Sequence, residues 1–145
     1  MIVNKGVLGK VVAHVYTIEF QKRVLPHMHL LVWCAPEDQI RTAEDLDQLI
    51  SAEFPDQATH PRLYELVKKY MVHGPCGEGY PHAPCMVKGK YSKGSPKPFQ
   101  ASTTFTSDGY PHYHCRDDGR KHTVHGVEVN NQWVVPYVAF LLLCK

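Results

Sequence analysis

Two histidines separated by a single residue are the sharpest chemical feature of this sequence. His27 and His29 lie in the run 26–34, PHMHLLVWC, whose residue types predict a β-strand. Successive side chains of a strand point to opposite faces, so the two imidazoles share one face and can chelate a single metal ion. The alternative is an exposed polar strand face that binds nothing, and the histidine pair alone favours that alternative.

A third ligand for such a site has to come from a neighbouring strand. The run 11–21, VVAHVYTIEFQ, predicts a strand that a short turn joins to the histidine strand in antiparallel fashion. Glu19 and Gln21 share one face of this run and lie within reach across the turn. We choose Glu19 as the third ligand, with Gln21 in reserve. Two imidazoles and a carboxylate suit Mn²⁺ or Mg²⁺ in phosphoryl transfer, and Zn²⁺ would also fit.

A second group of metal-ligating residues lies in a loop rich in glycine and proline. His73 and Cys76 follow the His-x-x-Cys spacing, and Cys85 comes nine residues later. This pattern is compatible with structural zinc, although free thiols explain it as well. The residues that could complete the ligand set are Cys115, His82, His112 and His114.

Basic residues accompany both groups. Lys22 and Arg23 fall in the turn beside the histidine pair, where they could contact phosphate or simply be solvated. The loop after Cys85 has basic residues interleaved with two aromatic ones: Lys88, Lys90, Lys93 and Lys97, with Tyr91 and Phe99. Such a mixture suits contact with single-stranded DNA, since lysines follow the backbone and aromatic rings stack on bases. A solvated basic loop is an equally good explanation.

Composition and length narrow the class of protein. The chain has 145 residues, one domain's worth, and its 43% apolar and 21% charged residues argue against disorder. A net charge of +2 is too small to imply nucleic-acid binding by itself. The apolar run 133–144 is too short to span a bilayer, so we expect no membrane association. Five cysteines without a secretory signal predict reduced thiols and an intracellular protein.

The remaining elements predict an α+β fold, an antiparallel sheet with flanking helices. Apolar spacing predicts helices over Thr42–Phe54, with Thr42 as N-cap, and over Pro61–Met71. We expect Leu46, Leu49, Ile50, Leu66 and Val67 to be buried in these two helices.

Two further hairpins are expected in the second half of the chain. Asp108-Gly109 predicts a turn between strands over Ser102–Thr106 and Tyr110–Cys115. Asn130-Asn131 predicts another turn, which would pair Val124–Val129 with Trp133–Val135.

Beyond these local patterns, a series of longer motifs resembles one known family. The motifs are IEFQKRVLPHMHLLVW (18–33), ISAEFPD (50–56), LYELVKKYMVHGPCG (63–77), PCM (84–86), SKGSPKPF (92–99), TSDGYPHY (106–113) and NQWVVPY (131–137). In this order they resemble the replication-initiator nuclease domain of Helitron transposons, also called the Helitron helicase-like domain. The resemblance covers nearly the whole chain.

The resemblance implies a nuclease of the His-hydrophobe-His class that acts in rolling-circle transposition. In that class a histidine pair and a third residue hold a divalent metal that polarises a phosphate of single-stranded DNA, and a tyrosine on a helix attacks. His27 and His29 match the histidine pair of this family. The resemblance also implies a nuclear location if the protein is functional. Zinc in the loop remains open, because Tyr91 stands where family members usually have a cysteine.

The chain also departs from the family pattern. The family's catalytic Tyr-x-x-Lys-Tyr motif and its upstream strand and helix are not found, so we expect a domain truncated at both ends. No tyrosine of this chain is nominated as nucleophile, including Tyr137. No phosphate-binding P-loop is found either, so the helicase module of the parent protein is absent. The alternatives are a non-catalytic remnant that binds metal and DNA, and a translated fragment without function.

Overall fold

The computed structural model describes residues 6–20, 26–74, 76, 80, 82–83, 85–88, 90–91 and 95–144. It combines helices with small antiparallel sheets, which agrees with the α+β class. The chain divides into two compact units, Met1–Arg41 and Thr42–Lys145. That these units form one domain, as the sequence suggests, stays a prediction.

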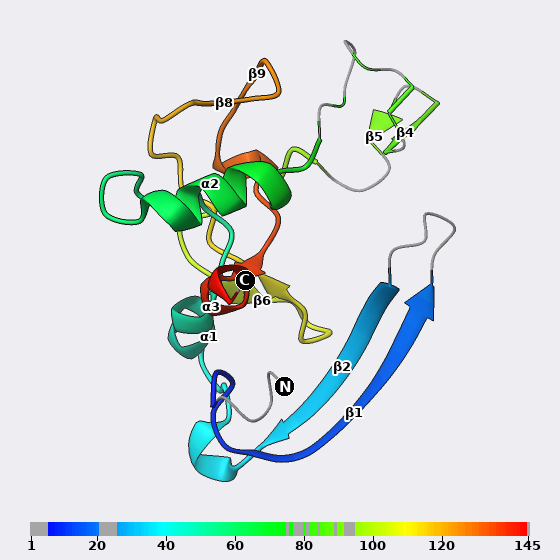
Figure 1. Ribbon diagram of the computed structural model, residues 1–145, viewed down its shortest axis with the longest axis vertical. Helices are drawn as coiled ribbons and strands as arrows, with labels where there is room; N and C mark the ends of the chain where they lie inside the picture. Colours follow the sequence, from blue (N-terminus) through cyan, green and yellow to red (C-terminus); the bar gives the residue numbers. More distant parts are fainter. Residues whose placement is uncertain are drawn as a thin grey trace. The chain divides into compact units, whose positions relative to one another are not determined.

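The first unit is built on one long antiparallel hairpin (Figure 1). Strand β1 (Val11–Phe20) pairs with strand β2 (Pro26–Cys34), and Glu19 stands directly opposite His27. Both strands are confirmed at the predicted positions. Gln21 and the turn that contains Lys22 lie outside the described residues.

The two faces of this hairpin differ in chemistry. Even-numbered residues of β1 share a face with even-numbered residues of β2, because the register pairs Ile18 with Met28 and Tyr16 with Leu30. This face is apolar apart from His14, and Tyr16, Ile18, Phe20 and Met28 are each more than half exposed. The opposite face carries Glu19, His27 and His29, so the three predicted ligands lie on one side of the hairpin.

Hydrogen bonds connect the two chain segments where β1 begins and β2 ends. The Ala35 amide donates a hydrogen bond to the Lys10 carbonyl at 2.8 Å, and the Lys10 amide donates to Oδ2 of Asp38 at 2.7 Å. Asp38 belongs to the 3₁₀ helix η2 (Pro36–Asp38). Gly9 has a φ of +80°, and a side chain there would collide with Asp38 at 2.6 Å, so this end of the unit requires glycine.

The second unit opens with helix α1 (Ala43–Leu49), which is shorter than predicted. Thr42 is the N-cap as expected, and it forms a capping box with Asp45. The prediction that the helix continues to Phe54 is wrong. Ile50 is extended, and strand β3 (Ile50–Ser51) pairs with strand β10 (Tyr137–Val138) instead.

Helix α2 (Pro61–Tyr70) supplies one side of the core. Leu63, Tyr64 and Val67 are buried in a cluster with residues from distant segments: Phe54, Val124, Val129, Val134 and Tyr137. Tyr64 was not among the residues predicted to be buried, and Tyr70 at the end of the helix is exposed.

The burial predicted for the two helices is complete at two of the five positions and partial at the other three. Leu46 and Val67 are buried, and Leu49, Ile50 and Leu66 are half-buried. Shorter elements complete the unit: β4 (Met86–Val87), β5 (Lys90–Tyr91) and α3 (Ala139–Leu143). None of the helices in the described part of the chain combines the length and the apolar character needed to cross a bilayer.

One of the two later hairpins has the predicted turn. Strand β6 (Thr104–Phe105) pairs with β7 (Pro111–His112), and Gly109 adopts a φ of +78° between them. The strands are shorter than expected.

The other hairpin turns at a different place. Strand β8 (His122–Val124) pairs with β9 (Val127–Val129) through a turn at His125-Gly126, where both residues have positive φ. Positive φ at both central residues matches the right-handed twist of short hairpins. The predicted turn at Asn130-Asn131 is therefore wrong, and Asn130 caps the 3₁₀ helix η3 (Asn131–Trp133).

A histidine at the start of β8 makes the stability of the second unit depend on pH. His122 stacks on Phe54 with 4.0 Å between ring centroids, and its Nδ1 lies 2.8 Å from the Tyr64 hydroxyl. Burial lowers the pKa of His122 from 6.5; among weaker effects, the charge of Asp118 opposes this and those of Arg120 and Lys68 reinforce it. A lowered pKa means that the unfolded chain takes up the proton first. The stabilisation is therefore complete above pH 6.5 and lost as the pH falls through the folded-state pKa.

We therefore expect the free energy of unfolding to decrease when the pH falls from about 7.5 to about 5.5. His122→Phe should keep the stacking on Phe54 and remove this part of the pH dependence. Urea unfolding of both proteins at the two pH values measures the effect. An identical pH dependence in the two proteins would show that His122 is not its source.

Candidate functional site

Three predicted ligands lie on one face of the β1–β2 hairpin, and two of them are in contact. Glu19 pairs across the strands with His27, and Thr17 pairs with His29, so Glu19 shares a face with both histidines. The Nε2 atom of His29 lies 3.4 Å from Oε2 of Glu19. The expectation that the Glu19 carboxylate lies within a few ångströms of an imidazole is confirmed.

These side chains are well exposed, at 69% for His29 and 61% for Glu19. Two imidazole nitrogens and a carboxylate are donors that divalent ions such as Mn²⁺ and Zn²⁺ accept, and the contact between His29 and Glu19 shows that two of the donors already converge. The exposure leaves room for a second, external molecule on a bound ion. Gln21, the reserve ligand, lies outside the described residues.

The structure also brings together His73, Cys76 and Cys85 of the predicted loop cluster, but not Cys115. One ligand atom from each of His73, Cys76 and Cys85 lies within 4.8 Å of the other two. Both thiols are buried and unoxidised. Burial first, then the hydrogen bond and charge of Cys85, raise the pKa of Cys76 to about 11.

Cys115, the third cysteine proposed for this cluster, is not part of it. Its backbone forms two hydrogen bonds with Gln100, both at 2.8 Å, and its side chain lines a different cavity of about 410 Å³. Lys97 and Tyr113 also line that cavity. The spacing of cysteines along the chain could not distinguish Cys115 from the others.

The basic residues of the loop are only partly described. Lys88 is exposed and has a φ of 51° in the turn between β4 and β5, which presents its charge to solvent. Lys97 is half-buried, and burial lowers its pKa. Lys93 and Arg23 lie outside the described residues, as does the side chain of Lys90. Among the lysines and the arginine predicted to contact DNA, Lys88 is therefore the one whose side chain is both described and exposed.

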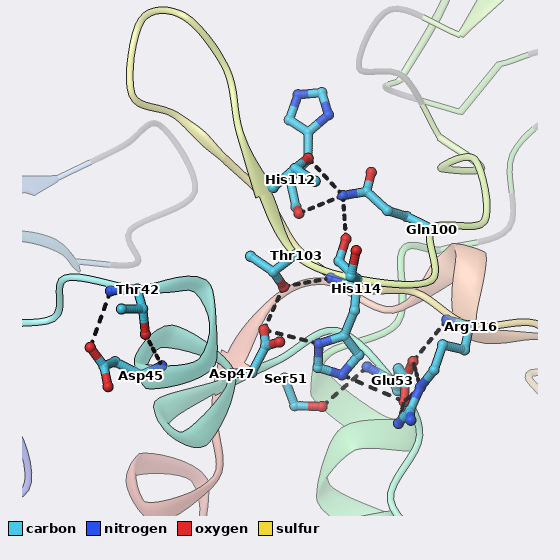
Figure 2. A network of polar contacts seen from close by, with 12 residues as sticks. Thr42, Asp45, Asp47, Ser51, Glu53, Gln100, Thr103, His112, His114 and Arg116 are labelled. Atoms are coloured by element: carbon cyan, nitrogen blue, oxygen red, sulfur yellow. Dashed lines mark hydrogen bonds and ion pairs between the residues drawn. The ribbon is translucent and has the colours of Figure 1, made fainter.

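A polar network around His114 was not predicted from the sequence (Figure 2). His114 Nδ1 lies 3.0 Å from Asp47 of α1, and its Nε2 lies 3.7 Å from Glu53. The Thr103 hydroxyl donates to Asp47 and accepts from the His114 amide. The network joins residues 47–53 to residues 103–116, a link that no local sequence signal reveals.

Glu53 is the centre of this network. Burial opposes its ionisation, but hydrogen bonds from the Arg116 side chain and amide, and the charges of His114 and Arg116, hold the pKa of Glu53 below 4.5. Arg116 binds both carboxylate oxygens, with its shortest side-chain contact at 2.7 Å. Asp47 and Glu53 each contact a basic side chain, so we assign the network a structural role.

Tyr137 is also explained by structure. It is 5% exposed, and its hydroxyl donates a hydrogen bond to the Glu53 carbonyl at 3.0 Å. Burial raises the pKa of Tyr137. A buried hydroxyl with a backbone partner is unsuited to attack on DNA, which supports leaving Tyr137 out of the catalytic residues.

Comparison with known proteins points to one family. Residues 1–32 match the sequence profile described as "Helitron helicase-like domain at N-terminus". The matched segment contains β1, most of β2 and all three residues of the polar face. No curated protein matches the chain. The match supports a Helitron helicase-like N-terminal domain and suggests the family of Helitron transposition proteins.

Proposed function

We propose that this chain is part of a Helitron-type rolling-circle transposition protein, in which His27, His29 and Glu19 hold the divalent metal of the nuclease. The parent protein would nick and join single-stranded DNA through a tyrosine nucleophile. The observation that carries the proposal is the placement of three ligating side chains on one hairpin face, two of them in contact, inside the segment that matches the family profile.

The chemistry required is charge stabilisation at a phosphate. A divalent ion, when bound, polarises a phosphate oxygen and orients it. His27 and His29 supply neutral nitrogen donors, and Glu19 supplies a negative charge that offsets part of the ion's charge. All three stand on two paired strands, so the backbone register holds them on one face of the hairpin, and the exposed side chains would turn toward the ion on binding.

Single-stranded DNA is the partner that we propose for the whole chain, together with the nuclear location that the resemblance to the Helitron family implies. Lys88 in the β4–β5 turn is exposed and free to follow a phosphate backbone. Lys22 and Arg23 lie between Glu19 and His27 in the sequence, and we propose that they also contact the DNA phosphates.

Titration with Mn²⁺ tests the metal site, with loss of the free-ion paramagnetic resonance signal as the readout. The double variant His27→Ala/His29→Ala should bind about 100-fold more weakly or not at all, and Glu19→Gln about 10-fold more weakly. His14→Ala is the matched control, because His14 lies on the same hairpin but on the opposite face. Its affinity should equal that of the wild type.

Two results would contradict the proposal. One is an absence of Mn²⁺ binding by the wild-type chain. The other is equal affinity in the wild type and the double histidine variant. Circular dichroism should show the same fold for all variants, since the substituted side chains are exposed.

A further inference from the structure

The loop that follows α2 contains a buried set of ligating atoms. His73, Cys76 and Cys85 each place one such atom within 4.8 Å of the other two. The two cysteine side chains are each 8% exposed. These three residues have no part in the metal face of the first unit, so they have to be explained separately.

One nitrogen atom of this cluster lacks a hydrogen-bond partner among the described residues. The Nε2 atom of His73 is buried and, within the described part of the chain, has no hydrogen-bond partner. Buried polar atoms in native proteins are nearly always paired, and each exception needs an explanation, of which a bound ion or water is one. Here the exception belongs to a residue that already stands beside two thiols.

The separation of the ligand atoms fits a zinc ion closely. Zinc binds sulfur at about 2.3 Å and nitrogen at about 2.0 Å in a tetrahedral arrangement, which sets two bound sulfurs roughly 3.8 Å apart. A bound sulfur and nitrogen lie about 3.5 Å apart, so a spread of 4.8 Å or less needs a contraction of no more than about 1.3 Å. Two thiolates and an imidazole are soft donors that select zinc over magnesium or manganese.

The positions of His73 and Cys85 show which parts of the second unit such an ion would connect. The His73 amide donates to the Trp133 carbonyl at 2.8 Å, and the two rings stack with 6.4 Å between centroids. The preceding residue, Val72, forms a bridge with Val134, which is 1% exposed. His73 is therefore fixed to the core. Cys85, by contrast, directly precedes β4 and the basic turn of Lys88.

We propose that His73, Cys76 and Cys85 bind a structural zinc ion that fastens the base of the β4–β5 hairpin to the core of the second unit. The three side chains occupy three of four tetrahedral positions, and a water molecule or a further side chain takes the fourth. Part of the folding free energy of this loop would then come from metal binding.

Substitution of cobalt for zinc tests this site in the full chain. The wild type, purified under reducing conditions, should bind one equivalent of Co²⁺ with the near-ultraviolet absorption of thiolate-to-cobalt charge transfer and the visible bands of a tetrahedral ion. Added Zn²⁺ should abolish this spectrum. Cys85→Ser and His73→Ala should each weaken zinc binding by about 100-fold or more.

Two controls separate this site from others. Cys144→Ser removes an exposed thiol and should leave the spectrum unchanged. His27→Ala/His29→Ala should also leave it unchanged, so the two metal sites can fail independently. The proposal is overturned if the wild type shows no thiolate charge-transfer band, or if Cys85→Ser retains it. If a variant fails to fold, the spectrum of the wild type with Co²⁺ still tests whether the zinc site exists.

Discussion

Replacing Asn131 with alanine is expected to lower the free energy of unfolding of the second unit by about 2–5 kcal/mol. Asn131 is 2% exposed, and its side chain forms two hydrogen bonds with the backbone of distant segments. Its Oδ1 accepts from the Phe54 amide at 2.9 Å, and its Nδ2 donates to the Arg116 carbonyl at 3.0 Å. Alanine would leave both backbone groups unpaired, and a buried unpaired group costs about 1–3 kcal/mol.

The neighbouring residue provides the control for this substitution. Asn130 accepts from the Gln132 amide at 3.1 Å, which is a local cap of η3. Asn130→Ala should cost only about 1 kcal/mol, the usual value of a cap. Urea unfolding followed by tryptophan fluorescence compares the two, because Trp133 lies in the same 3₁₀ helix. Equal losses would mean that the contacts of Asn131 with Phe54 and Arg116 contribute little.

The parts of the fold that depend on neighbouring residues could be predicted from the sequence. The β1–β2 hairpin follows from alternation in two adjacent runs, and its register places Glu19 opposite His27 without help from the rest of the chain. The N-cap at Thr42 and the turn at Gly109 are also local signals. The candidate metal face could be predicted because it depends only on this hairpin.

The errors arise where distant segments compete for the same residues. Apolar spacing extended α1 to Phe54, but Ile50 instead pairs with Val138, and Phe54 packs beside His122. Asn130-Asn131 resembled a turn because asparagine is common in turns. Burial of Asn131 against Phe54 is a tertiary contact, and no local pattern indicates it.

The two polar clusters of the second unit also show that local contacts could be predicted from the sequence and contacts between distant segments could not. His73 and Cys76 are close in sequence, so their pairing could be anticipated, whereas the exclusion of Cys115 depends on how the loop folds back. The network of Asp47, Glu53 and His114 joins residues about sixty positions apart. Sequence spacing carries no information about contacts of that kind.

Glu53 provides the second large effect on stability. Glu53→Ala removes the carboxylate that pairs with Arg116 at 2.7 Å and lies 3.7 Å from His114. We expect a loss of about 2–4 kcal/mol in the free energy of unfolding at neutral pH, since hydrogen bonds to charged groups contribute about 1.5–3 kcal/mol each. The estimate stays below the full value of a buried ion pair because the Arg116 side chain is 63% exposed and can be solvated.

The pH dependence identifies the source of this loss. The pKa of Glu53 is lower in the folded protein than its ordinary value of 4.5, so its contribution is complete above pH 4.5 and disappears as the pH falls through the folded-state pKa. The destabilisation caused by Glu53→Ala should therefore shrink in acid, where the wild type has lost the same interaction. Glu128→Ala is the control, because its pair with Lys121 is exposed on both sides and should contribute little at any pH. If urea unfolding shows the same loss for Glu53→Ala at neutral and acidic pH, packing rather than charge explains the role of Glu53.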